Sequence, residues 1–97
     1  MFEIRLSEAG EVLMSGRLDA AQCDKALKFL DGVVAPHVVD LGKLEYISSA
    51  GLGVLLKTQK RLLSTGGKVR LTGLRPGLKD IFVFSGFDQI FEIDGSR

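Results

Sequence analysis

The chain opens with two short stretches in which apolar and polar residues alternate, which is the pattern of a strand with one buried face. Phe2, Ile4 and Leu6 are the apolar half of the first stretch, and a second strand is predicted over 11–15. Residues 8–11 between the two stretches are typical of a turn. The chain is therefore predicted to begin with a β-hairpin.

Three helices follow from apolar residues that recur every three or four positions. The first begins after Asp19, a typical N-cap residue, and Gln22 three positions later completes a capping-box-like pair. The second spans about 49–65, and its apolar side is predicted to hold Leu52, Leu55, Leu56, Gln59, Leu62 and Leu63. The third begins at Pro76, a residue favoured at the first helical position, and ends at Gly86.

Three further strands are predicted over 37–41, 68–71 and 90–93. The first of them is apolar on both faces, as expected for a central strand of a parallel sheet. The resulting order is β-β-α-β-α-β-α-β. Alternating strands and helices of this kind predict a single α/β domain over residues 1–97, with a mixed, largely parallel sheet and helices packed on it.

The charges are nearly balanced, with 13 Lys and Arg residues against 12 Asp and Glu residues, a formal net charge of +1. This balance gives no general attraction to nucleic acid or to anionic membranes. Cys23 and His37 are the only cysteine and histidine, which excludes a disulfide within the chain and a four-ligand Cys/His zinc site. No apolar stretch approaches the ~18 residues of a membrane-spanning helix. We therefore expect a cytoplasmic protein without membrane insertion, metal site or direct nucleic-acid contact.

The clearest candidate chemistry lies where the third predicted strand leads, through a short loop, into the second helix. The first turn of that helix contains two serines and two glycines: Ser48, Ser49, Gly51 and Gly53. One interpretation is structural, because a serine here caps backbone N–H groups and glycines permit close packing. The other is functional, because a hydroxyl at the positive end of a helix is well placed for modification.

Spacing disfavours two enzymatic interpretations of this stretch. Gly51 and Gly53 belong to an incomplete Gly-x-Gly-x-x-Gly motif, but residues 46–79 contain no Asp or Glu, which a dinucleotide site needs there. A Ser-His-Asp hydrolase would require His37 beside Ser49, yet the strand between them separates the two by more than about 10 Å. We therefore expect a binding protein and not an enzyme.

The same stretch, 46–79, carries seven basic residues, which are Lys57, Lys60, Arg61, Lys68, Arg70, Arg75 and Lys79. The favoured interpretation is a solvated helix face together with outward strand positions. Nucleic-acid binding is less well supported, because Tyr46 is the only aromatic residue in the polar part of the stretch. Complementarity to an acidic protein partner is the third alternative. Outside the stretch, Cys23 is expected to be a small core residue, and Phe84 or Phe87 is a candidate for an exposed contact.

Several segments form a recognisable set: Val-Val-Asp-Leu at 38–41, Tyr-Ile-Ser-Ser-Ala-Gly-Leu-Gly at 46–53, Gly-Arg-Leu-Asp at 16–19 and Gly-Gly at 66–67. Together they resemble the signature of the STAS domain family, the sulphate transporter and anti-sigma-factor antagonist family. The resemblance covers nearly the whole chain and agrees with the predicted order of elements. It implies that residues 1–97 form one STAS-like domain.

The resemblance implies an anti-sigma-factor antagonist that needs no cofactor. Such a protein binds an anti-sigma-factor serine kinase and so releases a sigma factor for transcription; the kinase, with ATP and magnesium, phosphorylates the antagonist, and a cognate phosphatase resets it. Ser49 matches the phosphorylated serine of the family. Ser48 stands where the family usually has Asp and is the competing site, and Ala50 stands where the family has Ser or Thr.

The expected partner-binding residues lie around this serine: Asp19, Ser48, Ser49, Ala50, Gly51, Leu52, Gly53, Lys57 and Lys60. They are expected to form one surface, because loops that follow the carboxyl ends of parallel strands meet at one edge of the sheet. The departures at Ser48 and Ala50 support an alternative with the same fold, an accessory subunit of a lipid or phospholipid transport complex or another signalling scaffold. The oligomeric state stays open.

Overall fold

The computed structural model describes residues 1–33 and 38–93. Its helices and strands are β1 (Phe2–Leu6), β2 (Val12–Leu18), α1 (Cys23–Asp31), β3 (Val38–Ile47), α2 (Ser49–Leu63), β4 (Arg70–Thr72), α3 (Pro76–Phe84) and β5 (Glu92–Ile93). Two single 3-10 turns complete the list, η1 (Ala20–Gln22) before α1 and η2 (Phe87–Gln89) after α3.

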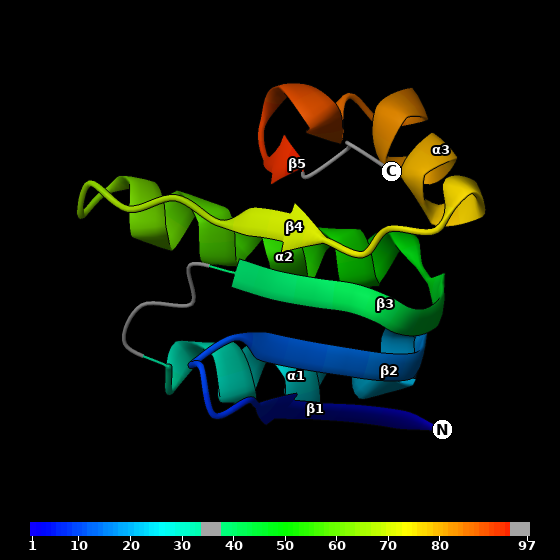
Figure 1. Ribbon diagram of the computed structural model, residues 1–97, viewed down its shortest axis with the longest axis horizontal. Helices are drawn as coiled ribbons and strands as arrows, with labels where there is room; N and C mark the ends of the chain where they lie inside the picture. The colour runs from blue at the N-terminus through cyan, green and yellow to red at the C-terminus, as the bar shows by residue number, and fades with distance from the viewer. Residues whose placement is uncertain (34–37, 94–97) are drawn as a thin grey trace.

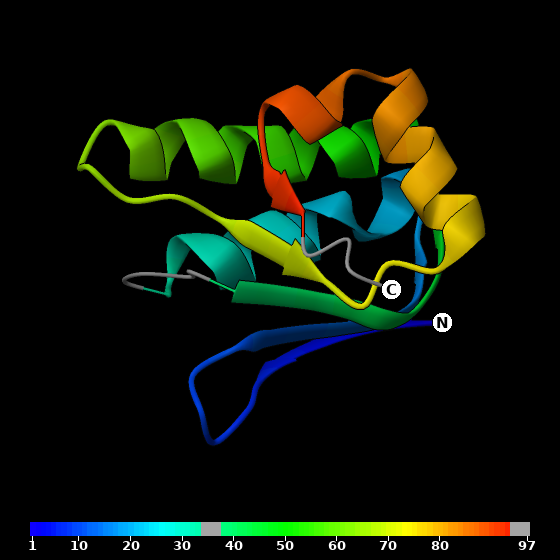
Figure 2. The same ribbon diagram turned by 45° about the horizontal axis from the view of Figure 1, so that its top comes forward.

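The strands form one five-stranded sheet in the order β1-β2-β3-β4-β5. β1 and β2 are antiparallel, and every later pair is parallel. Figures 1 and 2 show α1 and α2 side by side along one face of the sheet, while α3 stands at the end where β3 and β4 finish. The predicted fold class, a mixed and largely parallel sheet with helices packed on it, is confirmed.

β3 continues to Ile47, whereas the sequence predicted only the first part of this strand and a loop after it. The physical reason is a pair of β-bulges. Residues 13–15 of β2 pair with 40–43 of β3, which places an extra residue in β3, and a second extra residue follows shortly afterwards. Leu41, Leu44 and Ile47 are consequently all buried at a spacing of three, a pattern that does not resemble an alternating strand.

The start of α1 also differs from the prediction. Asp19 is extended, but it precedes the short turn η1, and its side chain accepts no capping hydrogen bond. α1 itself begins at Cys23 after Gln22, which likewise makes no side-chain cap. The expected capping box is therefore wrong, because the chain first makes a 3-10 turn, closed by a hydrogen bond of 3.0 Å from Gln22 N to Asp19 O.

The apolar side predicted for α2 is confirmed for Leu52, Leu55, Gln59 and Leu62, which are buried, and Leu56 is half-buried. Leu63, expected on the apolar side, is 54% exposed, whereas Val54 and Thr58 are buried. Thr58 can occupy an apolar environment because its hydroxyl donates to Val54 O at 3.1 Å. Gly66, with φ +84°, lies in the turn just after the helix, where a helix stop was predicted.

Gln59 lies on the buried side of α2 and is fully enclosed. Its Oε1 accepts a hydrogen bond of 2.8 Å from Val69 N, and its Nε2 donates one of 2.7 Å to Ile90 O. One side chain thus joins α2 to the segments that enter β4 and β5. These two strands are short: β4 begins two residues later and ends one residue later than the predicted range 68–71, and β5 covers only the last two residues of 90–93.

Aromatic packing holds α3 and η2 against the sheet. Phe82 is fully buried and lies edge-on to the rings of Phe87 and Phe91, with ring centroids 6.0 and 6.5 Å away. Phe84, in contrast, is 90% exposed. Of the two phenylalanines considered as contact residues, Phe84 is therefore the exposed one. Ile81, 36% exposed, borders the same outer side of α3.

Among the described residues, no helix combines the length and the apolar character needed to cross a membrane.

Candidate functional site

The candidate site lies at the carboxyl ends of β2 and β3, the right-hand end of the sheet in Figure 1. β2 ends at Leu18 and β3 ends at Ile47, and α2 begins two residues later. The N–H of Ser48 donates to the carbonyl oxygen of Leu18 at 2.9 Å, which joins the two strand ends directly. The segment Gly16–Asp19 and the start of α2 are therefore neighbours in space.

Ser48 is the N-cap of α2. Its backbone is extended, with φ −86° and ψ 170°, and its Oγ accepts a hydrogen bond of 3.1 Å from the N–H of Gly51. Its carbonyl oxygen accepts the first helical bond, 2.9 Å from Leu52 N. The structural interpretation of the serine pair thus applies to Ser48, whose half-buried hydroxyl is engaged in the cap.

Ser49 is the first residue of α2, and its side chain is exposed. Its hydroxyl makes no hydrogen bond with any described residue. Ala50 beside it is exposed as well. The first N–H groups of a helix have no partner within the helix, and together with the helix dipole they favour an anion at this end. A negatively charged group on the Ser49 oxygen would therefore be electrostatically compatible with the folded chain.

The two glycines of this turn differ in their surroundings. A Cβ on Gly51 would lie 2.8 Å from Ile47 Cγ1 and 2.9 Å from Leu18 Cγ, whereas a Cβ on Gly53 would meet nothing within 4 Å. Gly51 thus permits a close approach within the chain and not to a partner. Leu52 is only 8% exposed. The expectation that Gly51 and Leu52 belong to the contact surface is corrected, because both face the core.

This difference predicts opposite effects of two identical substitutions. Gly51→Ala should lower the free energy of unfolding by about 1–3 kcal/mol, because the methyl group overpacks the junction with Leu18 and Ile47. Gly53→Ala should raise it by up to about 1 kcal/mol, because alanine is the better helix former and the space is open. Urea denaturation of both variants measures the two effects. A loss of stability at Gly53 equal to that at Gly51 would contradict this account.

Cys23 and Asp19 are neighbours of the capping residue Ser48. The Cys23 thiol donates to Asp19 O at 3.3 Å. Burial raises the pKa of this thiol, and the nearby Asp19 and Asp24 carboxylates raise it further, while a hydrogen bond from Ser48 acts in the opposite direction. The net effect keeps the thiol protonated at neutral pH, and the side chain packs partly against the core as expected. Asp19 Oδ1 is enclosed and accepts no hydrogen bond from a described residue.

Arg17 and Tyr46 form a pair beside the site that the sequence did not single out. The Arg17 guanidinium carbon lies 4.4 Å from the centroid of the Tyr46 ring, a cation–π contact. Both residues are exposed, on the neighbouring strands β2 and β3. Each residue belongs to a segment that resembles the STAS signature, 16–19 or 46–53. The second bulge of β3 brings the two residues into register, and no pattern in the sequence indicates that bulge.

The basic residues of 46–79 do not form a single patch. Lys57 and Lys60 lie on the exposed side of α2, at the positions that continue the stripe from Ser49 through Gly53. Arg61 instead donates to Leu30 O at 2.8 Å and joins α2 to α1. The remaining four are Lys68 before β4, Arg70 in β4, Arg75 in the connection to α3 and Lys79 on α3. Only the first two lysines extend the candidate site.

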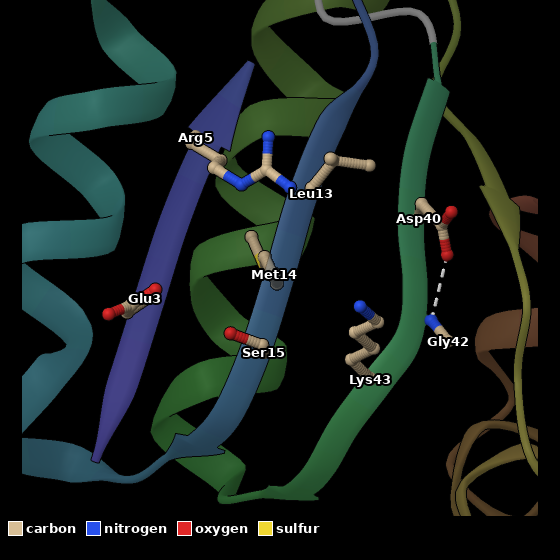
Figure 3. A pocket seen from close by; sticks show the side chains of 8 residues that line it. All are labelled: Glu3, Arg5, Leu13, Met14, Ser15, Asp40, Gly42 and Lys43. Atoms are coloured by element: carbon tan, nitrogen blue, oxygen red, sulfur yellow. Dashed lines mark hydrogen bonds between the residues drawn. The ribbon is translucent and has the colours of Figure 1, made fainter. Parts of the chain in front are cut away.

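A shallow hollow of about 560 Å³ lies on the sheet face opposite α1 and α2 (Figure 3). Its lining mixes charges of both signs from β1, β2 and β3: Glu3, Arg5, Leu13, Met14, Ser15, Asp40, Gly42 and Lys43. Asp40 Oδ1 accepts a hydrogen bond of 2.8 Å from Gly42 N and so supports the first bulge. These residues do not extend to the α2 N-terminus. His37, weighed for a hydrolase, lies outside the described residues.

Comparison with known proteins agrees with this fold. The profile of the family described as "Mlab, STAS domain" matches residues 3–92. The chain belongs to the STAS domain family.

Individual relatives refine the comparison. The chain is 42% identical over 78 residues to BtrV of Bordetella bronchiseptica, a protein named as an anti-sigma factor antagonist. That match spans 80% of this chain and 61% of the length of BtrV.

Two solved structures share the fold. An anti-sigma factor antagonist from Mycobacterium paratuberculosis superposes with a TM-score of 0.80 at 22% identity, covering 99% of this chain and 86% of the other. The phosphorylated form of the Bacillus cell fate determinant SpoIIAA gives a TM-score of 0.69 at 19% identity, covering 99% and 93%. The STAS membership thus rests on the family profile, and these structures support the architecture.

Proposed function

We propose that this chain is an anti-sigma-factor antagonist, a regulatory binding protein that acts on an anti-sigma-factor serine kinase in the cytoplasm. Phosphorylation of Ser49 by that kinase switches the binding off, and a cognate phosphatase restores it. The name of BtrV supports the first statement. The existence of a phosphorylated form of SpoIIAA, which shares the fold, supports the second. In this role the chain is the substrate of a kinase and carries out no catalysis.

The exposure of Ser49 carries the proposal. Its hydroxyl lies on the surface at the first position of α2, whereas the Ser48 oxygen accepts the Gly51 N–H at 3.1 Å. A kinase must bring the attacking oxygen to the γ-phosphate of ATP, so an exposed hydroxyl without internal hydrogen bonds is the better acceptor. Modifying Ser48 would also require breaking the cap of α2. These observations favour Ser49 over the competing Ser48.

Phosphopeptide mapping tests the proposal. The purified chain is incubated with a serine kinase of the anti-sigma-factor class and ATP, and the modified residue is located by mass spectrometry. We expect one phosphate, on Ser49, and none in Ser49→Ala. Phosphate on Ser48 alone would move the switch by one residue. No phosphate on either serine, in a mixture that phosphorylates another antagonist, would overturn the switch.

The contact surface proposed for the kinase consists of the exposed residues Ser49, Ala50, Lys57 and Lys60, together with the half-buried Gly53 on the same helix and the adjoining half-buried Ser48 and Asp19. The five exposed or partly exposed positions on α2 follow helical spacing along one side of that helix. The two lysines are complementary to an acidic surface of the kinase.

Lys60→Glu should therefore weaken binding of the kinase about tenfold at low salt, chiefly by slowing association, and should flatten its salt dependence. Surface plasmon resonance across a salt series measures both quantities. Lys43→Glu is the matched control, because Lys43 is also exposed but lies on the sheet face opposite α2. Equal effects of the two charge reversals would contradict the proposed charge complementarity. They would not contradict the proposed switch at Ser49.

The second candidate function is an accessory subunit of a lipid or phospholipid transport complex, or a signalling scaffold without phosphorylation. The observation that favours it is the pair of departures from the antagonist motif, Ser48 in place of Asp and Ala50 in place of Ser or Thr. Affinity purification of the full-length protein distinguishes the two: an anti-sigma-factor kinase among the captured proteins supports the first, and transporter subunits support the second.

A further inference from the structure

β1 forms one edge of the sheet, and among the described residues β2 is its only neighbouring strand (Figure 1). Arg17 N donates to Met1 O at 2.9 Å, and hydrogen-bonded pairs alternate along an antiparallel ladder. The odd-numbered residues of β1 therefore direct their backbone groups to β2. The N–H and C=O groups of Phe2, Ile4 and Leu6 point to the free edge, which is a template for another strand.

The side chains of β1 also alternate, between the two faces of the sheet. Glu3 and Arg5 are exposed on the sheet face that carries no α1 or α2 (Figure 3), and neither forms an ion pair with a described residue. Phe2, Ile4 and Leu6 face the helices. Phe2 is 3% exposed and Ile4 is half-buried, but Leu6 remains 46% exposed. The strand thus offers one acid, one base and one uncovered apolar side chain along an unpaired edge.

We propose that this edge binds a second copy of the chain, with the two β1 strands antiparallel about a two-fold axis at Ile4. Ile4 then pairs with Ile4 of the second copy, and Phe2 pairs with Leu6, all through the outward backbone groups. Glu3 of each copy lies directly opposite Arg5 of the other. These are non-hydrogen-bonded positions, where Cα atoms are about 4.5 Å apart and side chains interact most closely.

The charges select this register over its neighbours. The outward backbone groups occur at every second residue, so the register between the two β1 strands can change only in steps of two residues. Each such step moves the two-fold axis by one residue. An axis at Glu3 would place Glu3 opposite Glu3, and an axis at Arg5 would place Arg5 opposite Arg5. Both arrangements juxtapose like charges at the closest positions, which is destabilising. Only the axis at Ile4 forms two opposite-charge pairs.

One contact in the free chain involves the same edge. Lys25 Nζ, from α1, donates to Phe2 O at 3.2 Å. A backbone carbonyl oxygen has two lone pairs, so Phe2 O can accept the N–H of Leu6 from a second copy as well. The lysine side chain is exposed and flexible and can also move away. The exposed face of α2, with Ser49, lies outside this interface and stays accessible in both copies.

Charge reversal provides a test that does not depend on one variant. Glu3→Arg gives a chain with two bases on the edge, and Arg5→Glu gives a chain with two acids. Each variant alone should dimerise about tenfold more weakly than the native chain, because like charges now face each other. An equimolar mixture of the two should associate again as a heterodimer, because every base then faces an acid. The double variant Glu3→Arg/Arg5→Glu should dimerise as the native chain does.

Sedimentation equilibrium from about 10 μM to about 1 mM measures the association, a range suited to small interfaces. Asp80→Arg is the control, since Asp80 is an exposed acid on α3, away from this edge; its dimerisation should equal that of the native chain. A native chain that stays monomeric at the highest concentration would overturn the proposal. Single variants that dimerise normally, or a mixture that forms no heterodimer, would overturn it too.

Discussion

Phosphorylation of Ser49 is expected to reduce the affinity for the proposed kinase partner by about a hundredfold or more while the chain remains folded. The phosphate adds about −1.5 to −2 charges at neutral pH. In the free chain this charge lies in water at the N-terminus of α2, where the helix favours an anion. In the docked complex it would be desolvated, and an unpaired buried charge costs several kcal/mol. Isothermal titration calorimetry on both forms measures the difference.

Substitutions of Ser49 should change the affinity for the kinase according to the charge that they introduce. Ser49→Ala should bind constitutively, and Ser49→Asp should bind with intermediate affinity, because its single charge and shorter side chain imitate the phosphate only in part. Ser85→Asp, at the exposed end of α3, is the control for adding one negative charge elsewhere. Thermal unfolding of the phosphorylated chain should stay close to that of the free form. Phosphorylated and unmodified chains of equal affinity would contradict the proposed switch.

Replacing Gln59 by leucine should lower the free energy of unfolding by about 3 kcal/mol. Leucine has a similar size but removes both hydrogen bonds, so the buried Val69 N–H and the Ile90 carbonyl lose their side-chain partner. An unsatisfied buried backbone group costs about 1–3 kcal/mol. In a chain of this size such a loss corresponds to a fall in Tm of about 15 °C. Differential scanning calorimetry measures it directly.

Gln89→Leu provides the matched control for this substitution. Gln89 is exposed in η2, and its amide donates only to the exposed Asp88 carboxylate at 3.3 Å. Its loss should change stability by no more than about 0.5 kcal/mol. If Gln59→Leu is as stable as Gln89→Leu, the bridge between α2, β4 and β5 does not stabilise the fold as described.

Local signals in the sequence were sufficient for the order of elements and for the end of the sheet that carries the candidate site. Pro76 begins α3, and Gly66 with its positive φ follows α2, because these residues have strong backbone preferences of their own. Ser48 was one of two candidates for the cap of α2, since the hydroxyl and the following turn are adjacent in the chain. Such features depend on a few neighbouring residues and can therefore be predicted from the sequence.

Features that depend on contacts with distant parts of the chain could not be predicted from the sequence. The bulges of β3 are defined by its pairing with β2, and the alternation that marks a strand is lost where Leu41, Leu44 and Ile47 are buried. Gln59 was placed correctly on the buried side of α2, but its partners lie 10 and 31 residues away. Gly51 was expected to face a partner, because the sequence cannot tell which surface approaches a glycine.

The junction of Ser48 and Gly51 with Leu18 has a consequence for the kinetics of recognition. The start of α2 is held by a hydrogen bond to the end of β2 and by contacts too close to admit a Cβ. A partner therefore meets a preorganised surface and has no loop to order on docking. Association should proceed in a single phase without a slow isomerisation. The lifetime of the complex then becomes the quantity on which a modification of Ser49 acts, and the encounter rate changes far less.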